Sequence, residues 1–177
     1  MDAHEFLIPF PAILHRNPQS AAPRARRGGR IPSARALRAL ALFAGLAEDE
    51  LREVAGRCDL ATAHPGQVLQ AQDVPVRRWH VIVSGHAVVQ RDGTPIALLG
   101  RGDSWPEHSL LNRQHSPITV VALSPLTLLT MGQRAFFALP EHHPVLAGRL
   151  VARSAVSADR LALPVFNALR HLERRGA

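Results

Sequence analysis

The spacing of apolar residues divides the chain into two helical regions with a strand-rich region between them. From residue 34 to 57, and again after Arg134, apolar residues recur every three or four positions, as on one face of a helix. From residue 59 to 131 they alternate with polar residues, and turn residues recur every 8–12 positions. This order predicts an antiparallel roll or sandwich of short strands between helices.

Two short helices are expected before the first strand. Ser33 can cap a helix over residues 34–42, which Gly45 would interrupt. A second helix is expected over residues 48–57, because its first turn holds three acidic residues that favour the helix dipole.

The strands of the central region are bounded by clear turn residues. Gly85 ends one strand, and Asp92-Gly93 is a strong hairpin signal. The strands expected after the His64-Pro65-Gly66 turn cover residues 79–83, 87–90, 95–99, 118–123 and 126–131.

The C-terminal region predicts a long helix followed by a short one. Pro144 can begin a helix, whose apolar face consists of Leu146, Leu150, Ala158 and Leu161. Pro164 interrupts it, and a basic amphipathic helix is expected to follow. Its inward positions are Val165, Ala168, Leu169 and Leu172, and its outward positions are Arg170, Arg174 and Arg175.

The positive charge is concentrated at the N-terminus. The chain has 177 residues and a net charge of +7. Residues 1–40 hold seven Arg and two acidic residues, a net +5, and residues 1–33 are rich in Pro, Ser, Gly and Arg. This composition predicts a disordered basic arm at 1–33, ahead of one domain at 34–163 and the short basic helix at 164–177. The stretch from Arg24 to Arg38 can bind nucleic acid, anionic lipid or an acidic partner, although a solvated arm is favoured.

Five segments carry motifs in a fixed order. They are residues 42–51 (LFAGLAEDEL), 65–69 (PGQVL), 81–89 (VIVSGHAVV), 102–111 (GDSWPEHSLL) and 118–123 (ITVVAL). Together they resemble the cyclic nucleotide-binding domain family, which includes catabolite activator protein. The resemblance implies an α+β, mainly β fold: a double-stranded β-helix, or jelly-roll-like β-roll, flanked by N-terminal helices and a long C-terminal helix.

The resemblance also implies a phosphate-binding cassette with a defined chemistry. In the family, a short helix offers N–H groups to the cyclic phosphate. A glutamate accepts a hydrogen bond from the ribose 2′-hydroxyl, and an arginine further along pairs with the phosphate. In this chain the glutamate position is Glu107, and the arginine position falls at Ser116.

Other substitutions in the cassette also remove phosphate-binding groups. Pro106 replaces a glycine and has no N–H, Pro117 removes another donor, and Ile118 occupies a position that is usually small. Losing the charge-assisted pair costs a few kcal/mol, which would move a micromolar site toward millimolar. The degenerate cassette consists of Gly102, Asp103, Glu107, His108, Ser109, Ser116 and Pro117.

Two neighbouring features bear on this interpretation. Arg113 or His115, in the same loop, can replace the missing arginine by reaching from a shifted position. In the turn at Gln72-Asp73-Val74, Asp73 stands where the family has glycine. Because Asp tolerates the left-handed conformation, the turn is expected to survive.

The remaining side chains do not favour metal binding or catalysis. His142 and His143 are adjacent and point apart, and Glu107-His108 lacks a second histidine four residues on. Ser109, His108 and Glu107 are neighbours in sequence rather than converging groups, so no enzyme activity, metal or cofactor is expected. Trp79 and Trp105 are expected to pack in the core.

Cys58 and the apolar run at residues 6–14 bear on the setting of the protein. Cys58 is the single cysteine, so it excludes an intramolecular disulfide framework, and its apolar context predicts a buried residue. The run at 6–14 has nine residues and two prolines, which is too short for a membrane span. A cytoplasmic setting is therefore expected.

The leading interpretation is a stand-alone, non-catalytic regulatory module in signal transduction, with weak or lost binding of cyclic AMP or cyclic GMP. It would act through a protein partner or a homodimer formed by the helix from Val145 to Leu161. One alternative is a divergent catabolite-activator-like regulator that uses its basic arm, although too few residues follow Pro164 for a helix-turn-helix. A second alternative is a protein-interaction adaptor.

Overall fold

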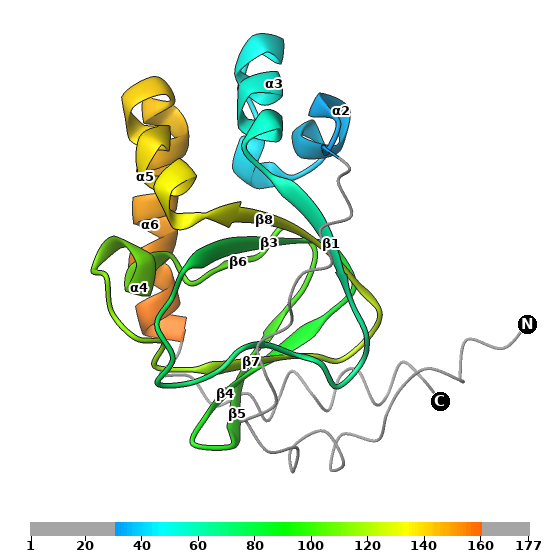
Figure 1. The fold of residues 1–177 in the computed structure, drawn as a ribbon, viewed down its shortest axis with the longest axis vertical. Coiled ribbons are helices and arrows are strands. Elements are labelled where there is room, and N and C mark those ends of the chain that lie inside the picture. The colour runs from blue at the N-terminus through cyan, green and yellow to red at the C-terminus, as the bar shows by residue number, and fades with distance from the viewer. Residues whose placement is uncertain (1–30, 161–177) are drawn as a thin grey trace, which may run out of the picture.

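The computed structural model describes residues 31–160, which contain two four-stranded antiparallel sheets (Figure 1). The order in sheet A is β1 (Asp59–Ala63), β8 (Leu126–Gly132), β3 (Arg78–Ser84) and β6 (Ser104–Trp105). The order in sheet B is β2 (Val68–Gln70), β7 (Thr119–Ala122), β4 (Ala87–Arg91) and β5 (Thr94–Leu99). The expected strand positions and the β-roll are therefore confirmed.

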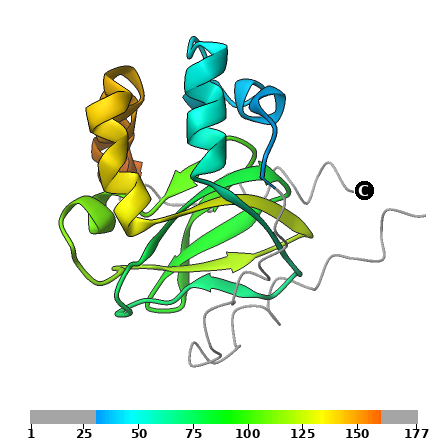
Figure 2. The same ribbon diagram turned by 45° about the horizontal axis from the view of Figure 1, so that its top comes forward.

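Helices precede, interrupt and follow the strands, and Figure 2 shows α3 and α5 standing over the same side of the roll. Before the first strand lie α2 (Ala34–Arg38), a 3-10 turn (Ala41–Phe43) and α3 (Glu48–Gly56). The short helix α4 (Glu107–Leu111) follows β6. After the last strand come α5 (Gln133–His142) and α6 (Pro144–Arg160).

The prediction of one helix over residues 34–42 was wrong at its C-terminal end. Ser33 caps α2 as expected, since its Oγ accepts from the Ala36 N–H at 3.2 Å. The helix ends at Arg38, and Leu40 is extended. A continuous α-helix could not turn all the buried side chains of this segment to one side; these are Leu37, Leu40, Leu42 and Phe43.

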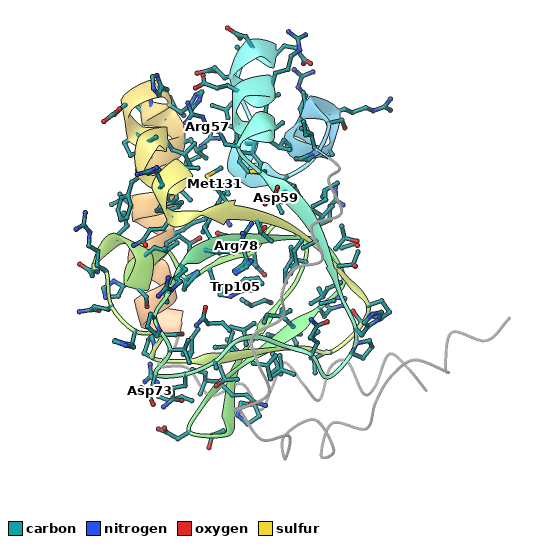
Figure 3. All side chains as sticks on the ribbon, viewed as in Figure 1. Arg57, Asp59, Asp73, Arg78, Trp105 and Met131 are labelled. Carbon is teal, nitrogen blue, oxygen red and sulfur yellow. The ribbon has the colours of Figure 1, made fainter. Side chains whose placement is uncertain are left out.

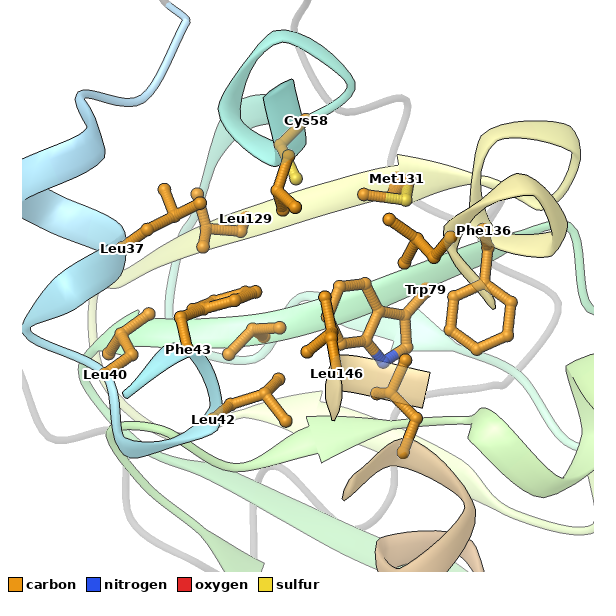
Figure 4. Close-up of a cluster of buried hydrophobic side chains, with 14 of the residues drawn as sticks. Leu37, Leu40, Leu42, Phe43, Cys58, Trp79, Leu129, Met131, Phe136 and Leu146 are labelled. Atoms are coloured by element: carbon orange, nitrogen blue, oxygen red, sulfur yellow. The ribbon is translucent and has the colours of Figure 1, made fainter. Parts of the chain in front are cut away.

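Sheet A is buried on both faces because its strands alternate between two cores. Trp79 and Val81 face the helices, while Ile82 faces the interior of the roll. Trp79 meets Phe43 edge-on, with ring centroids 6.4 Å apart, and Phe136 at 5.6 Å. Figure 4 shows this helix-covered core, which includes Leu37, Leu40, Leu42, Phe43, Cys58, Trp79, Leu129, Met131, Phe136 and Leu146.

The backbone conformation of two turns requires Gly85 in one and Asp92-Gly93 in the other. Gly85 has φ +91°, and a Cβ atom there would lie 2.3 Å from the Pro125 carbonyl oxygen. Any other residue would therefore clash with the backbone between β7 and β8. Asp92 and Gly93 both have positive φ, 50° and 76°, as the two-residue hairpin between β4 and β5 requires.

The long C-terminal helix packs on its own domain through its apolar stripe. Leu146 and Leu150 are buried in the helix-covered core. These two side chains are thus already covered within one chain, and any homodimer through α6 would have to use other positions or displace them. The Ala158 and Leu161 side chains of the expected stripe lie outside the described part.

Several predictions concern parts of the chain that lie outside the described residues. They are the basic arm up to residue 30, the apolar run at 6–14, residues 24–30 of the stretch from Arg24 to Arg38, and the helix expected over 164–177. The boundaries at 33 and 163 stay predictions.

Candidate functional site

The cassette begins with a turn that is held firmly against β3. Gly102 has φ +87°, and its N–H donates to the Ile82 carbonyl at 2.8 Å. The Ile82 N–H in turn donates to the Asp103 carbonyl at 2.9 Å. The Asp103 carboxylate accepts from the Gly100 N–H at 2.8 Å. Both predicted residues therefore have a structural role in fixing where the cassette starts.

Glu107, the predicted ribose-binding residue, points into the domain. Its side chain is 2% exposed. Its Oε1 accepts from Trp79 Nε1 at 3.1 Å and from the Ser104 hydroxyl. An acceptor that was expected to face a ligand is thus engaged by two donors of the chain itself. Pro106 immediately precedes α4, where its ring leaves no N–H to offer.

Ser116, at the predicted arginine position, is also turned inward. It is 1% exposed, and its hydroxyl donates to the Ile118 carbonyl at 2.7 Å. Its N–H donates to the Val74 carbonyl, and its own carbonyl accepts from the Asp73 N–H. Asp73 has φ +59°, which confirms the predicted left-handed turn. Ser116 therefore joins the end of the cassette to the turn after β2.

The two candidates for a substitute cation lie on the outside of the loop. The Arg113 guanidinium lies 5.7 Å from the centre of the Phe137 ring on α5, a cation–π arrangement. His115 is exposed and forms an isolated bridge with Pro75. In this arrangement Arg113 is held at the surface by Phe137.

The other predicted residues of the cassette are split between core and surface. Ser109 is 2% exposed, and its carbonyl accepts from the Gln114 N–H. His108 is exposed and lies 3.4 Å from the Asn112 side-chain nitrogen. Pro117 is exposed as well. The loop thus brings Glu107 and Ser109 to the interior and leaves His108 and Pro117 in solvent.

Sequence reasoning missed an arginine that reaches the cassette from α6. Arg153 Nη1 donates to the Gly102 carbonyl at 2.8 Å and lies 3.5 Å from the Ser104 hydroxyl. Ser104 in turn contacts Glu107, so α6 is connected to the cassette through polar groups. In the sequence, Arg153 is one of several arginines on a helix, and no local signal marks its partner.

His80 was predicted to be a partly buried strand residue or a surface residue, and it lies buried on β3, but its aromatic partner was not predicted. His80 on β3 stacks on Trp105, with ring centroids 5.0 Å apart and an interplanar angle of 25°. Figure 3 shows Trp105 in the space between the two sheets. Burial, with a smaller contribution from the charge of Arg78, lowers the pKa of His80 to about 3. His80 lies two residues before Ile82 and so shares its face of the strand. In the sequence, this spacing was the available signal that His80 is buried.

Neither a metal cluster nor a membrane-spanning helix is found between residues 31 and 160. No three His, Cys, Asp or Glu side chains in this range are grouped as metal ligands. No helix in the same range is long and apolar enough to cross a bilayer.

The cysteine Cys58 is buried, as predicted. Burial raises the pKa of its thiol to about 12.

Comparison with known proteins agrees with the β-roll fold. Residues 61–143 match the family model of the cyclic nucleotide-binding domain. This segment belongs to the cyclic nucleotide-binding domain family. A search of curated proteins found no match to the chain.

Solved structures of this family share the fold. A cAMP-binding acyltransferase from Mycobacterium smegmatis is 31% identical over 71% of this chain, with a TM-score of 0.58. A putative cyclic nucleotide-binding protein from Geobacter metallireducens is 18% identical over 73% of this chain and 98% of its own, with a TM-score of 0.63. The cAMP-bound PfPKA-R structure is also 18% identical, with a TM-score of 0.63. The chain spans 41% of the acyltransferase and 46% of PfPKA-R.

Proposed function

We propose that this cyclic nucleotide-binding domain is a non-catalytic regulatory module in which binding of cyclic AMP or cyclic GMP is weak or lost. One observation carries the proposal: Glu107 and Ser116, at the positions where the family contacts ribose and phosphate, both hydrogen-bond within the domain. Regulation would then pass through protein contacts, with another protein or a second copy.

The electrostatics of the cassette support weak binding. A cyclic phosphate carries one negative charge, and burying it without a guanidinium forfeits a charge-assisted pair worth roughly 2–3 kcal/mol, or about 100-fold in affinity. Arg113 lies over Phe137, and Arg153 donates to the Gly102 carbonyl. Recruiting either arginine to a phosphate would first break these interactions.

Calorimetric titration with cyclic AMP and cyclic GMP tests the proposal. We expect dissociation constants weaker than about 100 μM for the natural chain. A variant carrying Pro106→Gly, Ser116→Arg and Pro117→Ala should bind at least tenfold more tightly, because it restores two N–H groups and the guanidinium. A dissociation constant tighter than about 10 μM for the natural chain would overturn the proposal.

Arg113→Ala and His115→Ala are the matched controls for a substitute cation. If the cassette is degenerate, neither substitution changes the heat of titration. A tight site that either substitution weakens by tenfold or more would instead show that the loop supplies its own phosphate-binding group.

We also propose a cytoplasmic location for this module. The non-catalytic and the cytoplasmic parts of the proposal rest on separate residues. Glu107 and Ser109 are buried while His108 between them is exposed, so the three do not converge on one point. Cys58 is buried and unpaired by disulfide, as suits a reducing compartment.

A further inference from the structure

A single residue, His143, separates the two helices that follow the roll. It ends α5, where its N–H donates to the Leu139 carbonyl at 2.7 Å. Its own carbonyl accepts from the Ala147 N–H at 3.0 Å, in the first turn of α6. Its φ of −134° and ψ of 70° are not helical, and Pro144 follows at once. His143 is therefore the joint at which the direction of α6 relative to α5 is set.

The side chain of this joint is buried against α3. His143 is 1% exposed, whereas the neighbouring His142 is exposed. The Nε2 atom of His143 lies 3.3 Å from Glu53 Oε2, and its Nδ1 atom lies 3.8 Å from Glu50 Oε1. The two glutamates are three residues apart on α3 and so lie on one side of that helix. An imidazole between two carboxylates thus connects α3 to the α5–α6 joint, and Figure 2 shows α3 and α5 over the same side of the roll.

Each carboxylate is held in place by a group that belongs to the α3 segment itself. The second oxygen of Glu50 accepts from the Ala47 N–H at 2.7 Å, and the second oxygen of Glu53 accepts from Arg57 at 2.8 Å. The hydrogen bond from Arg57 holds the pKa of Glu53 below its ordinary value, and the charge of His143 acts in the same direction. Both glutamates therefore keep one oxygen for α3 and present the other to the imidazole.

The ring interacts with these carboxylates through charge rather than through aligned hydrogen bonds. Both ring nitrogens are buried, and neither makes a hydrogen bond within residues 31–160. A neutral ring therefore gains little from the two carboxylates, whereas a cationic ring is attracted by both. Burying a charge is costly unless it is paired, and here both pairs come from the opposite helix. Since an imidazole ordinarily gains its proton between pH 8 and pH 5, the strength of this contact should depend on pH.

The other charged groups of these three helices near the joint have partners or face solvent. Arg57 pairs with Glu53, and Glu48 pairs with two other arginines. Two titratable residues at the end of α5 are exposed, and the one charged residue in the first turns of α6 donates to backbone carbonyls before α3. These groups are Arg57 and Glu48 on α3, Glu141 and His142 on α5, and Arg149 on α6.

We propose that His143 forms a proton-dependent ionic bridge to Glu50 and Glu53, which holds the α5–α6 joint against α3 when the ring is cationic and loosens when the proton is lost. Because α6 carries Arg153 to the Gly102 carbonyl, the bridge makes the position of α6 on the domain sensitive to pH. The three bridging residues lie outside the cassette, so the inference does not depend on whether a cyclic nucleotide binds.

Double-mutant cycles in the full chain, measured at pH 5.5 and pH 8, test the bridge. His143→Gln is neutral at both pH values, and Glu53→Gln removes the nearer carboxylate. At pH 5.5 we expect the loss of Tm in the double variant to fall short of the sum of the single losses by roughly 2–4 °C. At pH 8 this coupling should be less than half as large, because the ring is then neutral. The cost of burying the ring is the same on both sides of the cycle and cancels.

Two matched controls separate the bridge from the charges around it. Glu48→Gln neutralises a carboxylate of the same helix that pairs with other arginines, so it should be additive with His143→Gln at both pH values. His142→Gln removes the exposed neighbouring histidine and should couple to Glu53→Gln less than half as strongly as His143→Gln does. Coupling of equal size at the two pH values, or stronger coupling through His142, would overturn the proposal.

Hydrogen exchange tests whether the bridge acts on α6. After correction for the intrinsic rate, the amides of residues 147–150 should exchange at least threefold faster at pH 8 than at pH 5.5 in the natural chain. With Glu50→Gln and Glu53→Gln combined, this ratio should approach one. These side chains are 36% and 40% exposed, so the combined variant leaves the core intact even if His143→Gln does not fold. If the ratio in the natural chain is already one, the bridge does not control α6 and the proposal fails.

Discussion

The helix-covered core on sheet A and the cassette between β5 and β7 bury their side chains in different ways. The core is almost wholly apolar, with Trp79 between Phe43 and Phe136. The cassette buries polar groups, Glu107 and Ser116, and satisfies them with donors and acceptors of the same chain. The apolar side chains that determine the fold thus lie apart from the cassette loop. Substitutions at the cassette's phosphate-facing positions are therefore compatible with an intact roll.

The largest loss of stability is expected from a substitution in the helix-covered core. Phe43→Ala should lower the free energy of unfolding by about 3–5 kcal/mol, because it leaves a cavity beside Trp79. Leu111→Ala in the cassette helix, at a side chain 37% exposed, should cost less than about 1 kcal/mol. Urea unfolding measures both. Equal losses would show that the cassette contributes as much to the fold as the core.

Removing the carboxyl that joins the two regions should have the next largest effect. Glu107→Ala leaves the Trp79 indole N–H and the Ser104 hydroxyl without their acceptor, at a cost of about 2–3 kcal/mol. Glu107→Gln keeps an oxygen acceptor and should cost less than half as much. Thermal unfolding of the two variants tests this; a loss below about 0.5 kcal/mol for Glu107→Ala would contradict the inward-facing role.

The buried histidine of the roll makes stability depend on pH. The pKa of His80 is about 3 in the folded domain against an ordinary 6.5. Between these values the unfolded chain binds a proton that the folded domain does not, so stability falls as the pH falls. From pH 7 to pH 5 the loss from His80 alone is about 2 kcal/mol.

His80→Phe keeps the stack on Trp105 and should remove most of this pH dependence, as read from urea unfolding at pH 7 and pH 5. His86→Phe, at an exposed histidine, is the matched control for introducing a phenylalanine. An identical slope in the natural chain and in His80→Phe would rule out a buried neutral His80.

The smallest expected effect is at the surface of the cassette. Arg113→Ala removes a cation–π contact with Phe137 at an exposed site and should cost about 0.5 kcal/mol. Phe137→Leu should remove the same contact. The double variant should therefore lose no more unfolding free energy than Phe137→Leu alone. A larger, additive loss would mean that Arg113 has another partner in the fold.

The sequence predicted the backbone better than the contacts of polar side chains. Strand limits, the Asp92-Gly93 hairpin and the left-handed Asp73 follow from alternation and turn chemistry, which are local properties. The end of α2 at Arg38 does not follow from local properties, because it depends on which side chains pack in the core. Glu107 lies on a short helix as predicted. Its role toward a ligand stays a prediction, and its two donors in the domain, Trp79 and Ser104, were not predicted.

The reason lies in the sequence separation of the partners. Trp79 is 28 residues from Glu107, and Arg153 is 51 residues from Gly102. Periodicity reports which face of an element is buried, but it does not report which donor will meet a given acceptor across the fold. Predicting the inward turn of Glu107 would have required knowing that β3 places an indole N–H beside α4.

Arg149 and Arg153 give α6 two separate attachments from one side of the helix. Arg149 donates to the Leu42 carbonyl at 3.0 Å and to that of Ala44, while Arg153 holds the Gly102 carbonyl. The helix is therefore hydrogen-bonded at two points, to the turn that follows α2 and to the start of the cassette. A substitution that removes one of these arginines leaves the other attachment in place, together with the buried Leu146 and Leu150.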